Sequence, residues 1–147
     1  MACVAASQRR VKSMFTTEDT EDAEFLNKKV AQAIIASAIC VHKNLGPGLL
    51  ESVYEKCLAY ELNERGHAIA VQQEIPIVYR SIRLESGFRT DLIVDNKVLV
   101  ELKAIDQLLP VHQAQVITYL KLTGIRTALL INFNVSLLKD GLRRISL

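Results

Sequence analysis

Three charged side chains stand in two apolar segments that otherwise have the composition of buried β-strands. Asp91 lies in residues 88–94, and Glu101 and Lys103 lie in residues 97–104. Alternate side chains of a strand point to the same side, so Glu101 and Lys103 share one face while the aliphatic residues between them share the other. A carboxylate pair beside a lysine is a set of groups that can do chemistry, provided that Asp91 reaches the same face.

The pairing register of the two strands decides where Asp91 points. A two-residue loop would place Asp91 on the most aliphatic face, at a cost of several kcal/mol for an unpaired buried charge. A three-residue loop at 95–97 pairs Val94 with Val98 and places Asp91 opposite Glu101. A bulge has the same effect. We expect the register that keeps one face purely aliphatic and gathers the charges on the other.

Two carboxylates that face each other repel strongly unless a cation lies between them. Hard oxygen ligands suit Mg²⁺ or Mn²⁺. A lysine ammonium nearby can orient an attacking water or stabilise charge on a phosphoryl oxygen. The set Asp91, Glu101 and Lys103 therefore fits metal-assisted hydrolysis of a phosphodiester. The alternative is an exposed strand edge on which these three charges only pair with one another.

The elements that must position these residues follow from apolar periodicity and from glycine and proline breaks. Residues 1–23 lack periodicity and are expected to form a disordered tail, and residues 24–147 form one domain. We expect helices at 25–44, 49–65 and 110–122 and strands at 70–79, 82–86, 88–94, 97–104, 127–133 and 141–147. Pro76 indicates an edge strand or a bulge in 70–79.

The composition is that of an ordinary globular protein, with 147 residues of which 50% are hydrophobic and 23% charged. A net charge of +2 permits an anionic partner without requiring one. Three widely spaced cysteines form no zinc or disulfide pattern. Reduced thiols in a cytoplasmic protein are therefore expected. No apolar run approaches the roughly 18 residues of a membrane span. The apolar first helix is able to face either its own sheet or a second subunit, which leaves a homodimer open.

The run from Asp91 to Glu101-Leu102-Lys103 resembles the signature of the PD-(D/E)xK nuclease superfamily. The segment "GLLESVY", which ends at Tyr54, resembles the GxxExxY motif of a small prokaryotic group in that superfamily. The similarity extends over residues 25–147. It implies an α/β (α+β) fold with a restriction-endonuclease-like αβββαβ core, a mixed central sheet flanked by helices, and an extra N-terminal helix. Thr90 departs from the pattern, which has proline there.

The resemblance implies a role for each matching residue. Asp91 and Glu101 correspond to metal-binding carboxylates, Lys103 to the catalytic lysine, and Glu51 to an extra acid that completes the metal site. Two further matches, Gln115 and Tyr119, correspond to a QxxxY motif on one helix face. The implied function is a Mg²⁺- or Mn²⁺-dependent nuclease that acts on DNA, with RNA left open. The alternative is a catalytically silent nucleic-acid-binding or assembly module on the same fold.

Some of these residues also have purely structural interpretations. Glu51 lies in the first turn of a helix, where an acid is favourable toward the helix dipole. Tyr54 is typical of a core aromatic whose hydroxyl finds a partner. Gln115 and Tyr119 are equally able to hold their helix to the sheet, and His112 is as compatible with a helix start as with an active site.

Overall fold

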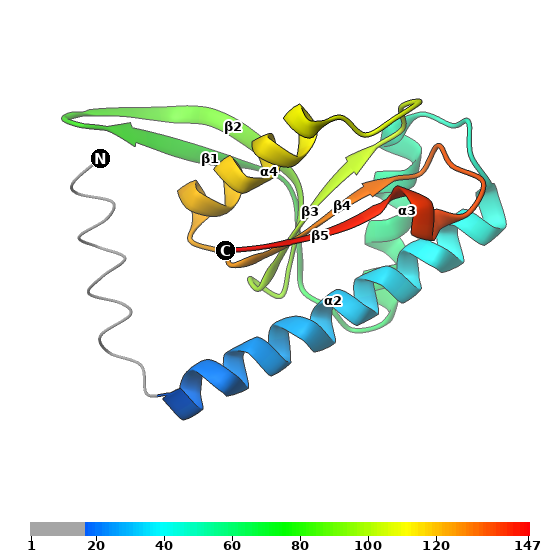
Figure 1. Cartoon of the computed structure of the whole chain (residues 1–147), viewed down its shortest axis with the longest axis horizontal. Helices are drawn as coiled ribbons and strands as arrows, with labels where there is room; N and C mark the ends of the chain where they lie inside the picture. The colour runs from blue at the N-terminus through cyan, green and yellow to red at the C-terminus, as the bar shows by residue number, and fades with distance from the viewer. Residues whose placement is uncertain (1–16) are drawn as a thin grey trace.

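A five-stranded sheet with helices on both faces makes up the protein (Figure 1). The computed structural model describes residues 17–147. The strands lie in the order β1-β2-β3-β4-β5, and the sheet is mixed because β3 and β4 are parallel while the other neighbours are antiparallel. In chain order the elements are α2 (Thr17–Leu45), α3 (Glu51–Glu64), β1 (Ile69–Tyr79), β2 (Ile82–Val94), β3 (Val98–Lys103), α4 (Pro110–Thr123), β4 (Thr127–Asn132), the short helix η1 (Leu138–Gly141) and β5 (Leu142–Ser146).

The first helix is longer than its apolar pattern predicts. It begins at Thr17, so residues 17–23 are helical and the expected disordered tail is wrong for that part; residues 1–16 lie outside the described residues. Acids are concentrated in the added turns, with Asp19 in the first of them, and negative charge is stabilising at a helix N-terminus. Apolar periodicity missed this segment because its described side chains, at 19–23, belong to neither hydrophobic core.

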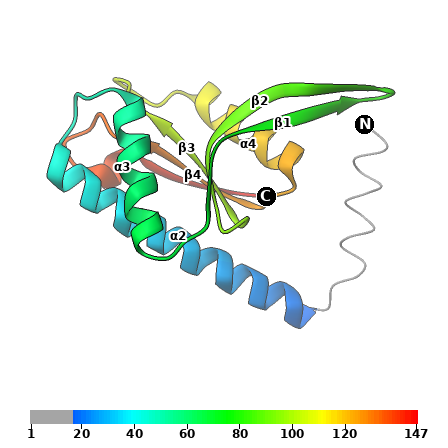
Figure 2. The same cartoon turned by 180° about the vertical axis from the view of Figure 1, so that it is seen from behind.

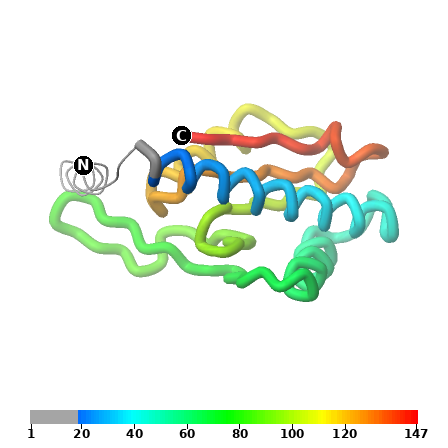
Figure 3. Tube along the Cα trace, turned by 90° about the horizontal axis from the view of Figure 1, so that it is seen from below, coloured from blue at the N-terminus to red at the C-terminus, as the bar shows by residue number. Residues whose placement is uncertain are grey.

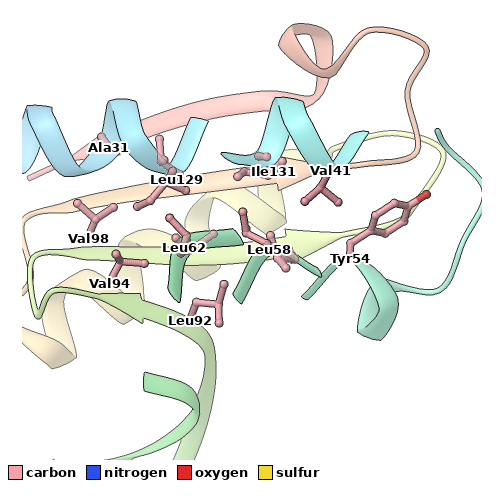
Figure 4. Packing of buried hydrophobic residues seen from close by; sticks show 14 of the residues in the cluster. Ala31, Val41, Tyr54, Leu58, Leu62, Leu92, Val94, Val98, Leu129 and Ile131 are labelled. Carbon is pink, nitrogen blue, oxygen red and sulfur yellow. The ribbon is translucent and has the colours of Figure 1, made fainter. Parts of the chain in front are cut away.

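The larger hydrophobic core lies between the sheet and the two helices α2 and α3 (Figures 2 and 4). Both helices send a stripe of side chains onto the sheet, from Val30 to Val41 in α2 and from Tyr54 to Leu62 in α3. The first helix therefore packs on its own sheet. Phe25 and Leu26 near the start of α2 are exposed. A homodimer stays a prediction.

Helix α4 covers the opposite face of the sheet with a smaller core. Val116 and Leu120 of this helix pack with Leu99 of β3 and with aliphatic residues of β4 and β5. Because side chains alternate along β3, the residues of that strand that share a face with Leu99 are Glu101 and Lys103. The catalytic candidates of β3 therefore belong to the α4 side of the sheet.

The loop between β2 and β3 has the predicted length and register. Val94 pairs with Val98, and the ladder continues through Ile93 with Leu99. Asp95 and Asn96 both have left-handed backbone conformations, with φ of 54° and 53°. These two residue types are the ones that tolerate that conformation best after glycine. The three-residue turn thus has positive φ at Asp95 and Asn96 and not at Lys97, its last residue.

Strands β1 and β2 form a long two-stranded arm that extends beyond the rest of the sheet (Figures 1 and 3). Residues 82–86 and 88–94 were expected as two strands, but β2 runs through both. Gly87 allows this continuity because the side chain of Ile77 occupies the space where its Cβ would be. The register of β1 against β2 shifts between Ile75 and Ile77, which confirms the irregularity predicted at Pro76 in an edge strand.

Candidate active site

Asp91 and Glu101 lie together where β2 and β3 begin to separate. The last pair of the β2–β3 ladder is Leu92 with Val100, and the same register continued by one residue places Asp91 opposite Glu101. The Oδ2 atom of Asp91 accepts a hydrogen bond of 2.8 Å from the backbone N–H of Leu102. The carboxylate of Asp91 thus replaces a backbone acceptor at the point where the ladder ends.

The carboxyl group of Glu101 is in an unfavourable environment for a charge. Its residue is 6% exposed, and its pKa is raised to about 9, mainly by burial and further by the charge of Asp91 and by their hydrogen bond. Lys103 acts in the opposite direction. Among the described residues, the Oε2 atom of Glu101 is the buried side-chain oxygen or nitrogen without a hydrogen-bond partner. A divalent cation would supply the missing partner and offset the repulsion between the two acids.

Glu51 reaches the pair from the start of α3, which lies at the same end of the molecule as the end of β3 (Figure 1). Burial raises the pKa of Glu51, the charges of Asp91 and Glu55 raise it further, and Lys103 lowers it. Glu51 is therefore near enough for its charge to interact with that of Asp91, and its role as a metal ligand stays a prediction. Its position is favourable toward the helix dipole as well, so its structural interpretation also stays open.

Tyr54 fixes the loop that leads into α3. Its hydroxyl donates a hydrogen bond of 2.6 Å to the carbonyl oxygen of Gly46 and accepts one of 3.1 Å from the N–H of Leu49. Its ring is fully buried and stacks on Phe133, with 4.5 Å between the ring centroids. The prediction of a core aromatic with a partnered hydroxyl is confirmed, and the tyrosine determines where Glu51 begins its helix.

Replacing Tyr54 by phenylalanine is expected to lower the free energy of unfolding by about 1–2 kcal/mol, because the ring remains packed while two hydrogen bonds are lost. Urea denaturation measures this loss. Tyr60→Phe is the matched control because Tyr60 is 64% exposed on the same helix, and it should change stability little. A Tyr54→Phe protein as stable as the wild type would contradict the role given to the hydroxyl.

Helix α4 closes the other side of the site. The ring of Tyr119 stacks on Phe88 of β2 at a centroid distance of 4.2 Å. Burial raises the pKa of Tyr119, the charges of Glu101 and Asp91 raise it further, and a hydrogen bond to Gln115 lowers it. Tyr119 is thus next to the carboxylates, and Gln115 is linked to them through Tyr119. His112 instead accepts the backbone N–H of Leu109 at 2.9 Å, which makes it a helix-start residue.

Two residues at the site were not among the sequence candidates. The side-chain amide of Gln72 in β1 donates to a carboxylate oxygen of Glu55 in α3 and, at 3.2 Å, to Oδ1 of Asp91. Glu55 follows Glu51 by one helical turn, and that spacing is a signal that could have indicated it. No such signal exists for Gln72, because its position depends on a local backbone conformation.

The acidic groups do not form a finished metal cage. Within residues 17–147, no three or more His, Cys, Asp or Glu side chains are arranged so that they could hold a metal ion as they stand. The unpartnered oxygen of Glu101 and its closeness to Asp91 nevertheless fit a divalent cation, which prefers carboxylate oxygens. The third carboxylate, that of Glu51, would have to move toward the pair to complete the expected set of ligands.

Comparison with known proteins agrees with this geometry. A family model described as the PD-(D/E)XK nuclease superfamily matches residues 28–145. The chain belongs to this superfamily. Its mixed sheet flanked by helices confirms the fold expected of a PD-(D/E)XK nuclease. The narrower resemblance to the GxxExxY group stays a prediction.

Further comparison adds no nearer relative, since no curated protein and no solved structure matches the chain at a significant level. Membership of the PD-(D/E)XK nuclease superfamily supports a nuclease-type function in general and implies nucleic acid as the class of substrate. Nucleases of the superfamily generally use divalent metal ions. Among the described residues, no helix is both long enough and apolar enough to cross a membrane.

Proposed function

We propose that the protein is a Mg²⁺- or Mn²⁺-dependent nuclease that hydrolyses phosphodiester bonds of DNA. The observation that supports this most directly is the buried Oε2 atom of Glu101, which has no hydrogen-bond partner. The carboxyl group that carries this atom lies next to the carboxylate of Asp91. A folded protein has no stability reason to place two acids together in this way. A bound divalent cation would offset the repulsion between these two acids.

Each residue of the candidate site has a distinct role in this proposal. Asp91 and Glu101 hold the cation, and Glu51 joins them directly or through a water. A cation held by these carboxylates would polarise the phosphate and lower the pKa of an attacking water. Lys103, whose charge acts on both Glu51 and Glu101, orients that water and stabilises negative charge on the phosphate. Leu102 keeps Asp91 in place through its backbone N–H.

The residues of α4 act on the opposite side of the scissile phosphate in this proposal. Tyr119 is held by its stack on Phe88 and by Gln115. Its hydroxyl is protonated at neutral pH, as a tyrosine ordinarily is, and burial and the neighbouring acids raise its pKa further. It is therefore able to donate a hydrogen bond to a phosphate oxygen. Gln115 fixes the direction of that hydroxyl.

The proposal is tested by cleavage assays on single-stranded, duplex and branched DNA and on RNA, each with Mg²⁺, with Mn²⁺ and with EDTA. We expect cleavage of DNA that requires the cation, and a fall of at least about 100-fold for Asp91→Ala, because the cation loses a direct ligand and is no longer held beside the phosphate. The absence of metal-dependent cleavage on every one of these substrates would contradict a nuclease. Salt-dependent binding without cleavage, unchanged in Asp91→Ala, is the result expected for a silent binding module instead.

A further inference from the structure

Gln72 has an uncommon backbone conformation at the base of the β1–β2 arm. Its φ is 51°, in the left-handed region, although it is not a glycine. The residues on both sides keep the same register against β2, with Val71 opposite Leu92 and Gln73 opposite Thr90. No register shift therefore accompanies it. A left-handed residue inside a strand is disfavoured for any side chain with a Cβ, so another interaction must stabilise it.

Gln72 is an exposed residue, yet its side chain reaches the acids. Its amide nitrogen, Nε2, donates to a carboxylate oxygen of Glu55 and to Oδ1 of Asp91, the second at 3.2 Å. The other oxygen of Asp91, Oδ2, accepts the N–H of Leu102 at 2.8 Å. Asp91 is consequently held through both of its oxygens, from β3 on one side and from β1 on the other.

We propose that Gln72 is a positioning residue, which holds the Asp91 carboxylate in the orientation that binds the divalent cation, and that Glu55 holds the amide of Gln72. The inference rests on the proposed function, because Asp91 needs such an orientation only if it is a ligand. An amide suits this task since it carries no net charge. It separates the carboxylates of Glu55 and Asp91 without competing with a cation for them as an ammonium would.

A purely structural role for Gln72 makes a different prediction. If the amide only joins β1 to α3, its loss changes stability and leaves cation affinity untouched. Glycine at position 72 separates the two roles, because glycine adopts positive φ without strain but has no amide. Gln72→Gly therefore removes the contact to Asp91 while it relieves the backbone.

The experiment is calorimetric titration of Mn²⁺ into the wild type, Gln72→Gly and Gln72→Ala, with a thermal melt of each protein. We expect the dissociation constant for Mn²⁺ to rise by about 10- to 100-fold in both variants, the range found when a residue that supports a metal ligand is removed. Gln73→Ala is the matched control on the neighbouring exposed position, and it should bind Mn²⁺ as the wild type does. Gln72→Asn keeps an amide but shortens the side chain, so it should also weaken Mn²⁺ binding. This variant is used in place of Gln72→Gly or Gln72→Ala if either of them fails to fold.

Two failures can be told apart in this experiment. If folded Gln72→Gly or Gln72→Asn binds Mn²⁺ with the affinity of the wild type, the positioning role of Gln72 is wrong and the proposed function stands. If the wild type itself takes up no Mn²⁺, the proposed function is wrong and the inference fails with it.

Discussion

Replacing Lys103 by methionine is expected to lower the rate of DNA cleavage by about 100- to 1,000-fold, the usual loss when a group that stabilises transition-state charge is removed. Methionine preserves most of the length and packing of the lysine side chain but has no charge. The affinity for Mn²⁺ should be unchanged or higher, since a positive charge beside Glu51 and Glu101 disappears. Single-turnover cleavage at saturating Mn²⁺ and calorimetric titration measure the two quantities separately.

Lys97→Met is the matched control for this variant, because Lys97 lies just before β3, at the opposite end of the strand from Lys103. It should cleave at the wild-type rate. A Lys103→Met protein that cleaves as fast as the wild type would remove the lysine from the reaction. A variant that loses Mn²⁺ binding in parallel with cleavage would show instead that Lys103 supports the acid site and does not act on the phosphate.

The Glu101→Gln variant is expected to be more stable than the wild type at pH 8 without divalent cations. The pKa of Glu101 is about 9 in the folded protein, above its unfolded value, so the folded state binds the additional proton between these two values. The contribution of Glu101 to stability is therefore full below about pH 4.5 and decreases as the pH rises toward 9, by up to about 1.4 kcal/mol per pH unit. Glutamine lacks this titration, and the difference at pH 8 should be on the order of a few kcal/mol.

Urea denaturation in EDTA at pH 5, 6.5 and 8 checks this expectation. The two proteins should become similar in stability toward pH 5, where Glu101 is protonated in most folded molecules. Adding Mg²⁺ or Mn²⁺ should stabilise the wild type at pH 8 more than the variant, because the cation favours the ionised carboxylate. Glu64→Gln, at an exposed position of α3, serves as the control. A constant difference from pH 5 to pH 8 would contradict the buried, proton-binding state of Glu101.

The face on which Asp91 lies could be derived from sequence, because a pairing shifted by one residue exchanges the two faces of the strand. Such a shift buries Asp91 among Val98 and Val100, so the hydrophobic effect favours the pairing that gathers the carboxylates. The stripes of α2 and α3 could be predicted for a similar reason, since burial imposes a regular spacing on apolar residues. Where burial determines which face of a helix or strand points to the core, the spacing of the apolar residues indicates that face.

The features that sequence did not reveal are those that burial does not decide. The described side chains in the first turns of α2, at 19–23, belong to neither hydrophobic core, so burial imposes no apolar spacing on them. Gly87 indicates a break when it is considered alone, yet the side chain of Ile77 makes it part of a continuous strand. Gln72 enters the site through one backbone angle, which a glutamine in a run of polar residues does not signal.

The outer edge of β1 also limits how this protein can associate with other chains. An edge strand offers free backbone groups to any extended peptide, and a long apolar ribbon is the kind of template on which fibrils grow. Along β1 this template is interrupted twice, by the left-handed backbone at Gln72 and by Pro76, which has no N–H to donate. Only short stretches remain on which another strand can continue the sheet. The two irregularities therefore also protect the exposed arm from sheet-to-sheet polymerisation.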